Sequence, residues 1–224
     1  REIVMGGAAL NPEVEAWFRK FKIPFTVGYG MTEAAPLMAY EDWWDFASKS
    51  CGKAIDTVEV RIDSEDPYNK VGEIQARGMN IMSGYFKNEE ATKAAFTADG
   101  WMRTGDLGLL DQKGNIFIKG RSKNMILSAN GQNIYPEEIE AVVNNQPYVI
   151  ESVVVDRGAR LVVLIYMDSE KAKAEGVDLE EYKKTIMAEV NKSMPAYSKV
   201  NVVEYMAEPF EKTPKMSIKR FMYK

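Results

Sequence analysis

Histidine is absent from the 224 residues, and cysteine occurs once, at Cys51. These absences exclude an internal disulfide, a zinc site built on histidine or a cysteine cluster, and the commonest general base of enzymes. Any chemistry therefore depends on Lys, Arg, Asp, Glu, Thr and backbone groups. No apolar run approaches the ~20 residues that span a bilayer, and no signal peptide is visible, so we expect a cytoplasmic protein.

The charge of the chain is nearly balanced. Lys and Arg number 29 against 33 Asp and Glu, a formal net charge of -4, which argues against wholesale nucleic-acid binding. Hydrophobic residues make up 46% of the chain, enough to bury a core. The chain begins without methionine in an apolar run, so we expect a piece of a longer protein.

The opening residues predict a strand at 1–5, a helix, and a second strand at 25–27. Asn11 precedes a proline and is a candidate N-cap for the helix. One face of this helix is apolar, with Val14, Trp17, Phe18 and Phe21. Alternation of strand and helix is typical of α/β folds, which bind ligands beyond the carboxyl ends of their strands.

The pattern changes twice along the rest of the chain. Between 51 and 119, short alternating strands separated by Gly, Asp and Asn predict a small barrel-like β region. Helices return after about 120, one beginning at Pro136 and another opened by Asp178. We therefore predict two domains, 1–120 and 121–224, with an α/β fold that becomes α+β in the carboxy-terminal half.

Several polar segments suit a nucleotide. Residues 28–33 combine glycines, an aromatic ring, a hydroxyl group and a carboxylate that could hold Mg²⁺. Asp106 lies on a predicted turn and could accept from two ribose hydroxyls, while Arg121 and Lys123 supply cations at the predicted domain break. Taken alone, each segment is better explained as an ordinary turn or a solvated surface.

Two further segments contain residues that ordinary turn or surface composition does not fully explain. A turn at 128–135 precedes the helix at Pro136, and composition explains all of it except Gly131 and Asn133. The end of the chain is basic, with apolar residues between the cations Lys212, Lys215, Lys219, Arg220 and Lys224. A frayed terminus that contacts an anionic membrane surface at the inner face of the membrane is one interpretation of this tail.

The order and spacing of these segments resemble the ANL superfamily of adenylate-forming enzymes: acyl-CoA synthetases, nonribosomal peptide synthetase adenylation domains and luciferases. The resemblance covers essentially the whole chain. Four stretches look like bacterial long-chain fatty-acid CoA ligases, at 72–74, 82–88, 120–126 and 133–136. The resemblance implies that 1–120 is the incomplete end of a large AMP-binding domain and that 121–224 is a small mobile domain.

An enzyme of this kind uses ATP, Mg²⁺ and CoA. The resemblance implies that a fatty acid becomes an acyl-adenylate with release of pyrophosphate, and that CoA then takes the acyl group with release of AMP. Neither step needs histidine, because phosphoryl-type transfer depends mainly on positioning and charge stabilisation. The family's Ser/Thr/Gly-rich phosphate loop is missing from these residues. We therefore expect an upstream part of the same enzyme as partner, and little or no ligase activity from this chain alone.

The resemblance also implies roles for individual residues on the adenine and phosphate side. The adenine pocket would be lined by Gly6, Gly7 and Ala8. Tyr29 would stack on the base, with Gly30 beside it. Thr32 would touch the α-phosphate, and Glu33 would be the Mg²⁺ carboxylate.

On the ribose side, the resemblance implies that Asp106 grips the ribose hydroxyls and that Arg121 supports the ribose. Lys123 would be the hinge position. Gly131 would lie on the loop that lines the pantetheine tunnel of CoA.

The terminal motif departs from the family pattern, Lys-Thr-Pro-Thr-Gly-Lys-Ile-x-Arg, whose sixth residue is the adenylation lysine. Residues 212–220 read Lys-Thr-Pro-Lys-Met-Ser-Ile-Lys-Arg, with Ser217 in that position. Either Lys215 or Lys219 reaches the same oxyanions, or the first half-reaction is impaired. We prefer Lys215, because Lys219 would share the face of Ser217 only in a regular strand.

Two other functions stay open at this point. A nucleotide-binding relative without catalysis would explain the serine in place of lysine. An adenylation domain that loads a carrier protein would not respond to CoA. The length of the acyl chain cannot be inferred, because upstream residues build most of the acyl pocket.

Overall fold

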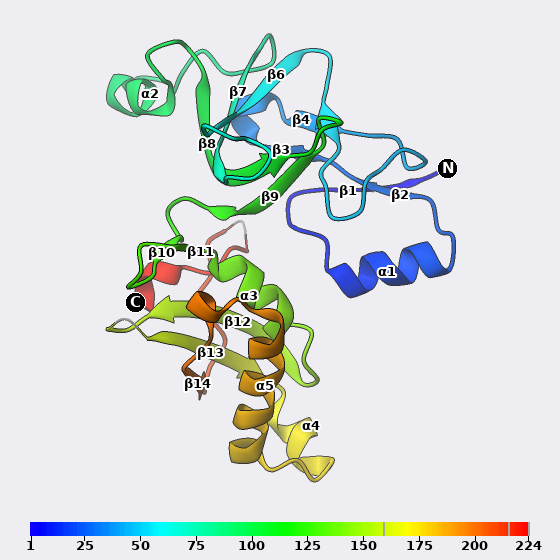
Figure 1. Ribbon diagram of the computed structural model, residues 1–224, viewed down its shortest axis with the longest axis vertical. Helices are drawn as coiled ribbons and strands as arrows, with labels where there is room; N and C mark the ends of the chain where they lie inside the picture. Colours follow the sequence, from blue (N-terminus) through cyan, green and yellow to red (C-terminus); the bar gives the residue numbers. More distant parts are fainter. Residues whose placement is uncertain (159, 215, 224) are drawn as a thin grey trace. The chain divides into compact units, whose positions relative to one another are not determined.

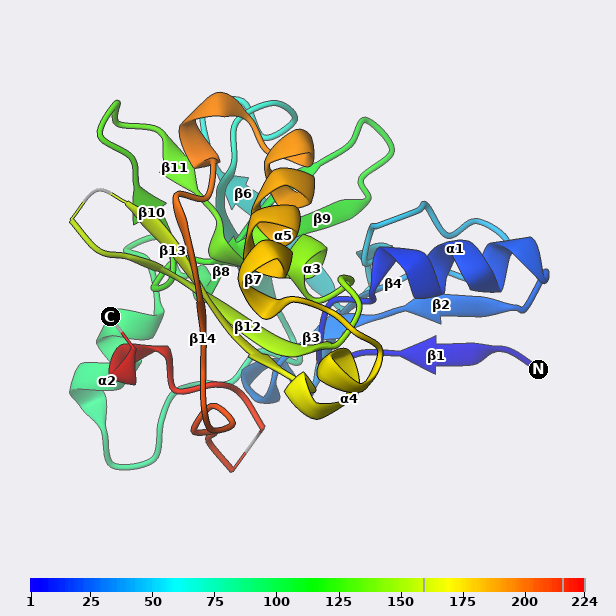
Figure 2. The same ribbon diagram turned by 90° about the horizontal axis from the view of Figure 1, so that it is seen from below.

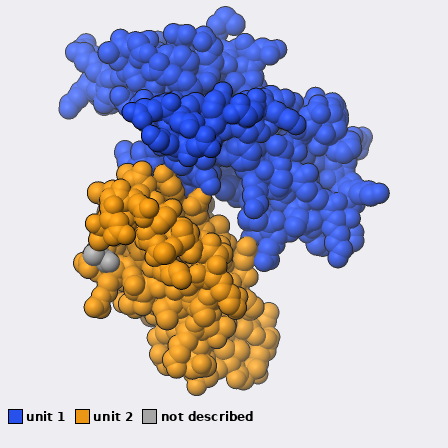
Figure 3. All heavy atoms as spheres, viewed as in Figure 1, with its two compact units in different colours: residues 1–123 blue, residues 124–224 orange. Residues whose placement is uncertain are grey.

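The computed structural model describes residues 1–158, 160–214 and 216–223. Figure 3 shows its two compact units, unit 1 (residues 1–123) and unit 2 (residues 124–224). Both units mix helices and strands, as Figure 1 shows. Among the described residues, no helix is long and apolar enough to cross a membrane.

The strand, helix and strand predicted for the first 27 residues are confirmed. Strand β1 (Ile3–Met5) pairs in parallel with β2 (Phe25–Val27), and α1 (Pro12–Lys20) connects them (Figure 2). The Asn11 side chain caps α1 by accepting from the backbone N–H groups of Glu13 and Val14, at 2.8 and 3.4 Å. This cap satisfies donors that the first helical turn leaves without partners.

The rest of unit 1 is mainly antiparallel sheet. A three-stranded sheet contains β3 (Tyr29–Gly30), β4 (Leu37–Tyr40) and β5 (Lys53–Ala54). A four-stranded sheet follows in sequence order, with β6 (Val58–Asp63), β7 (Gly72–Gly78), β8 (Met102–Leu110) and β9 (Ile116–Arg121). A short 3-10 helix (Thr32–Ala34) follows β3, and α2 (Glu89–Ala95) precedes β8.

The barrel-like region that we predicted is an open sheet. Among the described residues, β6 and β9 form the two edges of the four-stranded sheet and do not pair with each other. Its core includes Ile74, Met102 and Ile116, all essentially inaccessible to solvent. Alternating strands predict such an antiparallel sheet, but they do not determine whether its edges meet.

Unit 2 is built on one three-stranded sheet. Strand β13 (Leu161–Met167) lies between β12 (Val149–Asp156), which is antiparallel to it, and β14 (Val202–Tyr205), which is parallel. The helices are α3 (Pro136–Val143), α4 (Ser169–Ala174) and α5 (Leu179–Ser193). A small hairpin of β10 (Ile126–Leu127) and β11 (Asn133–Ile134) precedes α3. Asp178 caps α5, as predicted, by accepting from two backbone N–H groups of its first turn.

Both faces of the central strand β13 are covered. Val163 and Ile165 belong to a core cluster that includes side chains of α3 and α5, whereas Val162 and Leu164 belong to a second cluster with Phe210. Successive side chains of a strand point to opposite faces, so a strand covered on both sides is apolar throughout. The segment after β14 is therefore a layer of the fold and not a loose tail.

We predict that Phe210→Ala lowers the free energy of unfolding of unit 2 by about 3–5 kcal/mol, because it removes a buried aromatic ring from this layer. Phe221→Ala is the matched control: Phe221 is 74% exposed, and its loss should change stability by less than about 0.5 kcal/mol. Urea unfolding of both variants checks the prediction. If the two substitutions lowered the free energy of unfolding equally, Phe210 would not belong to a buried layer of the fold.

Candidate functional site

The first two strands bring the predicted adenine-binding segments together. The Gly28 N–H donates to the Met5 carbonyl at 2.8 Å, which extends the parallel pairing of β1 and β2. A Cβ atom on Gly6 would lie 3.2 Å from the Gly28 carbonyl oxygen. Gly6, Gly7 and Ala8 are exposed at this carboxyl edge of the strand pair, where α/β sheets bind ligands.

Asp106 is the centre of the predicted ribose site. It is 6% exposed, and it lies opposite Arg121 in the pairing of β8 and β9. The Tyr29 hydroxyl donates to its Oδ2 atom at 2.7 Å, and Arg121 Nε lies 2.8 Å from its Oδ1 atom. The Asp106 N–H donates to Thr104 Oγ1 at 3.0 Å. Side chains of β3 and β9 thus hold the carboxylate, and Thr104 of the same strand holds its backbone.

Tyr29 has a different environment from the one predicted. Its side chain is in the core and only 7% exposed, which leaves little of the ring for a base to stack on in this conformation. Burial raises the pKa of the Tyr29 phenol far above its usual value, and the Asp106 carboxylate raises it further. The phenol therefore stays protonated and donates to Asp106. The structure favours a role for Tyr29 in positioning Asp106, and stacking stays a prediction.

The structure explains why residue 30 is a glycine. A Cβ atom there would lie 2.0 Å from the carbonyl oxygen of Pro36, so no side chain fits. The Met31 N–H donates to the same carbonyl at 2.8 Å. The glycine is required by this close approach of two backbone segments, and it allows the turn that carries Thr32 and Glu33.

Thr32 and Glu33 lie in the 3-10 helix after β3, Thr32 exposed and Glu33 half-buried. The Glu33 Oε1 atom accepts from the Tyr85 hydroxyl at 3.1 Å, and its carbonyl accepts from the Met82 N–H at 2.8 Å. Asn80 fastens the same turn by donating to two backbone carbonyls. Sequence reasoning did not assign Tyr85 or Asn80 to the site. Tyr85 lies in the 82–88 stretch, whose resemblance to long-chain fatty-acid CoA ligases is the sequence signal for it.

A divalent cation could bind at Glu33 together with phosphate. Mg²⁺ is commonly held by one or two carboxylates, phosphate oxygens and water. Among the described residues, no group of three or more acidic, cysteine or histidine side chains is placed to hold a metal ion. Glu33 alone therefore fits as one ligand of a phosphate-bound Mg²⁺, and not as part of a protein cage.

In unit 2, Lys219 lies in a hairpin that Thr213 and Ser217 close. The Thr213 N–H donates to the Ser217 carbonyl, and the Lys219 N–H donates to the Glu211 carbonyl, both at 2.8 Å. These two bonds flank an isolated antiparallel bridge between Lys212 and Ile218. Lys219 Nζ lies 3.0 Å from Glu211 Oε2. Lys215, our preferred substitute for the missing lysine, lies outside the described residues.

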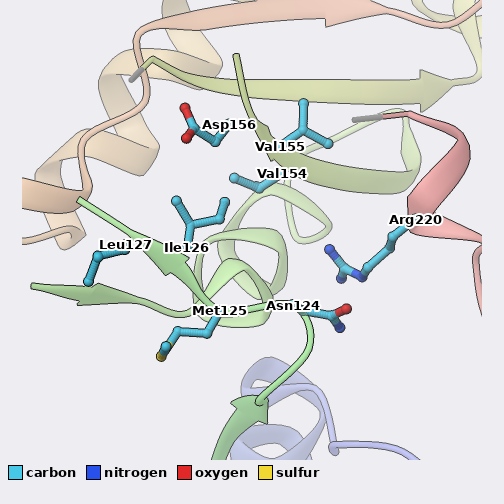
Figure 4. Close-up of a pocket in the computed structure, with 8 residues that line it drawn as sticks. All are labelled: Asn124, Met125, Ile126, Leu127, Val154, Val155, Asp156 and Arg220. Atoms are coloured by element: carbon cyan, nitrogen blue, oxygen red, sulfur yellow. The ribbon is translucent and has the colours of Figure 1, made fainter. Parts of the chain in front are cut away.

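A hollow of about 370 Å³ lies beside the end of this motif. Figure 4 shows Arg220 and Asn124 at one side of it and Asp156 and Leu127 at the other. The Arg220 guanidinium donates to both carboxylate oxygens of Glu140, which is buried in α3. This ion pair connects the terminal motif to the helix that follows β11.

Two further predicted residues lie on exposed backbone. Gly131 is at the tip of the β10–β11 hairpin with φ of +75°, a conformation that favours glycine, and no atom lies within 4 Å of an added Cβ. The Ser128 N–H donates to the Gln132 carbonyl at 2.9 Å across this tip. Lys123 is exposed and is the last residue of unit 1.

We predict that Tyr29→Phe lowers the free energy of unfolding by about 2 kcal/mol at pH 8, because a buried carboxylate loses a donor. The pKa of Tyr29 is raised by folding, so this stabilisation is fully present below the usual pKa of about 10 and is lost as pH rises above it. The difference between the two proteins should therefore shrink by about 1 kcal/mol from pH 10 to pH 11.

Urea unfolding of both proteins across this pH range measures the effect. Tyr68→Phe is the control, because Tyr68 is 45% exposed in the same unit. A constant difference between Tyr29→Phe and the unsubstituted protein would contradict a buried, protonated donor.

The sequence of the chain is similar to known protein families and to individual enzymes. AMP-binding enzymes match residues 1–86, and the C-terminal domain of AMP-binding enzymes matches residues 123–223. A long-chain-fatty-acid–CoA ligase of Mycobacterium bovis is 35% identical over 171 residues, 76% of this chain and 27% of the relative. The 4-coumarate–CoA ligase-like 4 protein of Oryza sativa subsp. japonica is 32% identical over 220 residues, 93% of this chain and 39% of the relative.

The fold of the chain is similar to that of solved CoA synthetases. The o-succinylbenzoate CoA synthetase of Bacillus subtilis, in complex with its acyl-adenylate intermediate, has a TM-score of 0.86 and 26% identity over 100% of this chain and 46% of its own. Its complex with ATP and a magnesium ion has a TM-score of 0.82 and 26% identity, over 99% of this chain and 46% of its own. The chain thus spans less than half the length of these relatives. It belongs to the AMP-binding enzymes of the ANL superfamily.

Proposed function

We propose that the chain is the carboxy-terminal part of an ATP-dependent, AMP-forming acyl-CoA ligase. The observation that carries this proposal is the buried Asp106 carboxylate, held by Tyr29 and Arg121, with Tyr29 directly after the Gly28 that approaches Gly6. A carboxylate fixed in this way can accept from two vicinal hydroxyl groups of a ribose. The relatives that resemble the chain are CoA ligases, one of them solved with an acyl-adenylate.

The proposed reaction has two steps. A carboxylate oxygen of the substrate attacks the α-phosphorus of ATP, and pyrophosphate leaves. The CoA thiolate then attacks the carbonyl carbon of the acyl-adenylate, and the bond to AMP breaks. Mg²⁺, held between the phosphates and Glu33, would neutralise charge in the first step. In this proposal Asp106 and Arg121 orient the ribose, and Thr32 lies at the α-phosphate.

A long-chain fatty acid is our proposed acyl substrate. The support is the Mycobacterium bovis relative and the resemblance of stretches such as 82–88. Proteins named 4-coumarate–CoA ligases also resemble the chain, so this likeness by itself does not separate fatty from aromatic acids. The acyl pocket would be formed largely by the part of the enzyme that precedes this chain.

A second candidate function follows from Ser217, which stands where the family has its adenylation lysine. A relative that binds nucleotide but does not form adenylates would tolerate this serine. Lys219 supports the ligase, because it lies two residues after Ser217, next to the bridge of Lys212 with Ile218. A lysine two residues further along the chain can reach the same phosphate oxyanions.

The first test is calorimetric titration of this chain with a non-hydrolysable acyl-adenylate mimic. We expect binding, and we expect Asp106→Ala to weaken it about 100-fold, because two hydrogen bonds to a carboxylate are lost. Asp56→Ala removes an exposed carboxylate of the same unit and should leave the affinity unchanged. Circular dichroism of each variant shows whether it is folded. Absence of binding by the unsubstituted chain would contradict the proposal that the chain alone holds the adenine and ribose half of the site.

The second test uses the full enzyme and follows ATP–pyrophosphate exchange, which reports the first step alone. Lys219→Ala should slow exchange by about 10²–10³-fold, the usual effect of removing a donor that stabilises transition-state charge. Lys212→Ala is the matched control, since the Lys212 side chain pairs with Glu151. If Lys219→Ala has no effect and Ser217→Lys raises exchange strongly, the non-catalytic alternative is favoured.

A further inference from the structure

The turn that carries Glu33 is fastened by a second segment of the chain, which starts at Asn80. Asn80 Nδ2 donates to the carbonyls of Ala34 and Leu37, at 2.7 and 2.8 Å, and so ties the end of the 3-10 helix to the start of β4. The Met82 N–H donates to the Glu33 carbonyl at 2.8 Å. Three backbone carbonyls of one turn thus accept from one segment.

The surroundings of Asn80 indicate that its amide is there for these two bonds. An amide group has two N–H donors and one carbonyl acceptor, and both neighbours are carbonyl oxygens, so only the nitrogen side fits against them. Among the described residues, Asn80 Oδ1 is buried without a hydrogen-bond partner. A buried acceptor without a partner is unfavourable. The two bonds to the turn therefore have to offset this unfavourable atom.

Tyr85 contacts the side chain of the same turn. Its hydroxyl donates to Glu33 Oε1 at 3.1 Å, and its N–H donates to Thr92 Oγ1 at 2.9 Å. Thr92 belongs to α2 and also donates to the Asn88 carbonyl at 2.8 Å. A Cβ atom on Gly84 would lie 2.6 Å from the Thr92 side chain, so the two segments approach closely. The backbone of Tyr85 is therefore fixed independently of Glu33.

These contacts leave one oxygen of the carboxylate available. Among the described residues, Glu33 Oε2 has no hydrogen-bond or ion-pair partner. Mg²⁺ on nucleotide phosphates is usually held by one or two carboxylates, and hydrogen bonds to such a carboxylate fix its orientation. A phenol bonded to Oε1 restricts rotation of the carboxylate, so Oε2 is the oxygen that remains for a metal.

We propose that Asn80 and Tyr85 are positioning residues for the Mg²⁺ ligand: Asn80 fixes the turn, and Tyr85 orients the Glu33 carboxylate so that Oε2 meets the Mg²⁺ of a bound Mg–nucleotide. This inference rests on the proposed function, in which Glu33 holds Mg²⁺. It assigns a task to two residues that do not themselves touch the metal or the nucleotide.

The test is calorimetric titration of this chain with ATP, in the presence and in the absence of Mg²⁺. Binding without the metal reports the adenine and ribose half of the site, and the gain in affinity on adding Mg²⁺ reports Glu33. Tyr85→Phe should reduce this gain about 10-fold and leave the metal-free affinity unchanged, because outer hydrogen bonds of metal ligands typically contribute about 10–100-fold. Tyr68→Phe is the matched control: Tyr68 is 45% exposed in the same unit, and its loss of a hydroxyl should change neither affinity.

A double-mutant cycle separates positioning from direct contact. Glu33→Gln should remove the gain from Mg²⁺, and Tyr85→Phe in that background should have no further effect, because Tyr85 acts only through Glu33. Asn80→Asp tests the turn, since a carboxylate would repel both carbonyls. It should reduce the gain at least as much as Tyr85→Phe, and circular dichroism shows whether the variant is folded.

Three results would overturn the inference. The unsubstituted chain could bind ATP with no gain from Mg²⁺, or Tyr85→Phe could leave the gain unchanged. Tyr85→Phe could also weaken ATP binding in the Glu33→Gln background as strongly as in the unsubstituted chain, which would make the Tyr85 hydroxyl a direct contact of the nucleotide.

Failure of the proposed function gives a different result, because the unsubstituted chain then binds ATP neither with nor without Mg²⁺. In that case ATP–pyrophosphate exchange by the complete enzyme decides. Tyr85→Phe should raise the half-saturating Mg²⁺ concentration about 10-fold. An unchanged concentration, or no exchange by the unsubstituted enzyme, overturns the inference.

Discussion

The buried carboxylate of Asp106 is the constraint around which unit 1 is arranged. A carboxylate removed from water is costly unless charged and hydrogen-bonding partners surround it. Its partners come from separate sheets, because Tyr29 belongs to β3 and Arg121 to β9. Satisfying one charge therefore joins the three-stranded sheet to the four-stranded sheet. The turn that carries Glu33 follows β3 directly, so it belongs to the same joined pair of sheets.

In unit 2, the terminal motif has Ser217 where the family pattern has lysine. In its terminal segment a single antiparallel bridge pairs Lys212 with Ile218, and the bonds on either side of it hold the backbone of Ser217 and Lys219. Glu211 holds the Lys219 ammonium group at 3.0 Å. An approaching phosphate would have to compete with this carboxylate. The ion pair of Arg220 with the buried Glu140 anchors the hairpin from its other end.

Local rules predicted the local features of the fold. Asn11 before a proline and Asp178 before an acidic turn identify helix starts, because capping depends on a few neighbouring residues. The contact of Tyr29 with Asp106 spans 77 residues, and no periodicity in the sequence signals it. The exposure of Trp17 and Phe21 in α1 was also unpredictable, since apolar spacing marks a face but does not say what covers it. For the site, the resemblance predicted the positions, and the structure added the hydrogen bond from Tyr85 to Glu33.

Strand β13 is covered by helices on one face and by the segment around Phe210 on the other. The order of these layers along the chain has a consequence for synthesis of the protein. The helices α3 and α5 and all three strands can emerge from the ribosome while one face of the sheet still lacks its cover, because Phe210, Ile218 and Tyr223 come later. Until residues 210–223 have emerged, Val162 and Leu164 stay open to water and to other apolar surfaces. Unit 2 therefore depends on its last residues to complete folding, and a nascent chain stalled shortly before them would present a valine-rich sheet to chaperones.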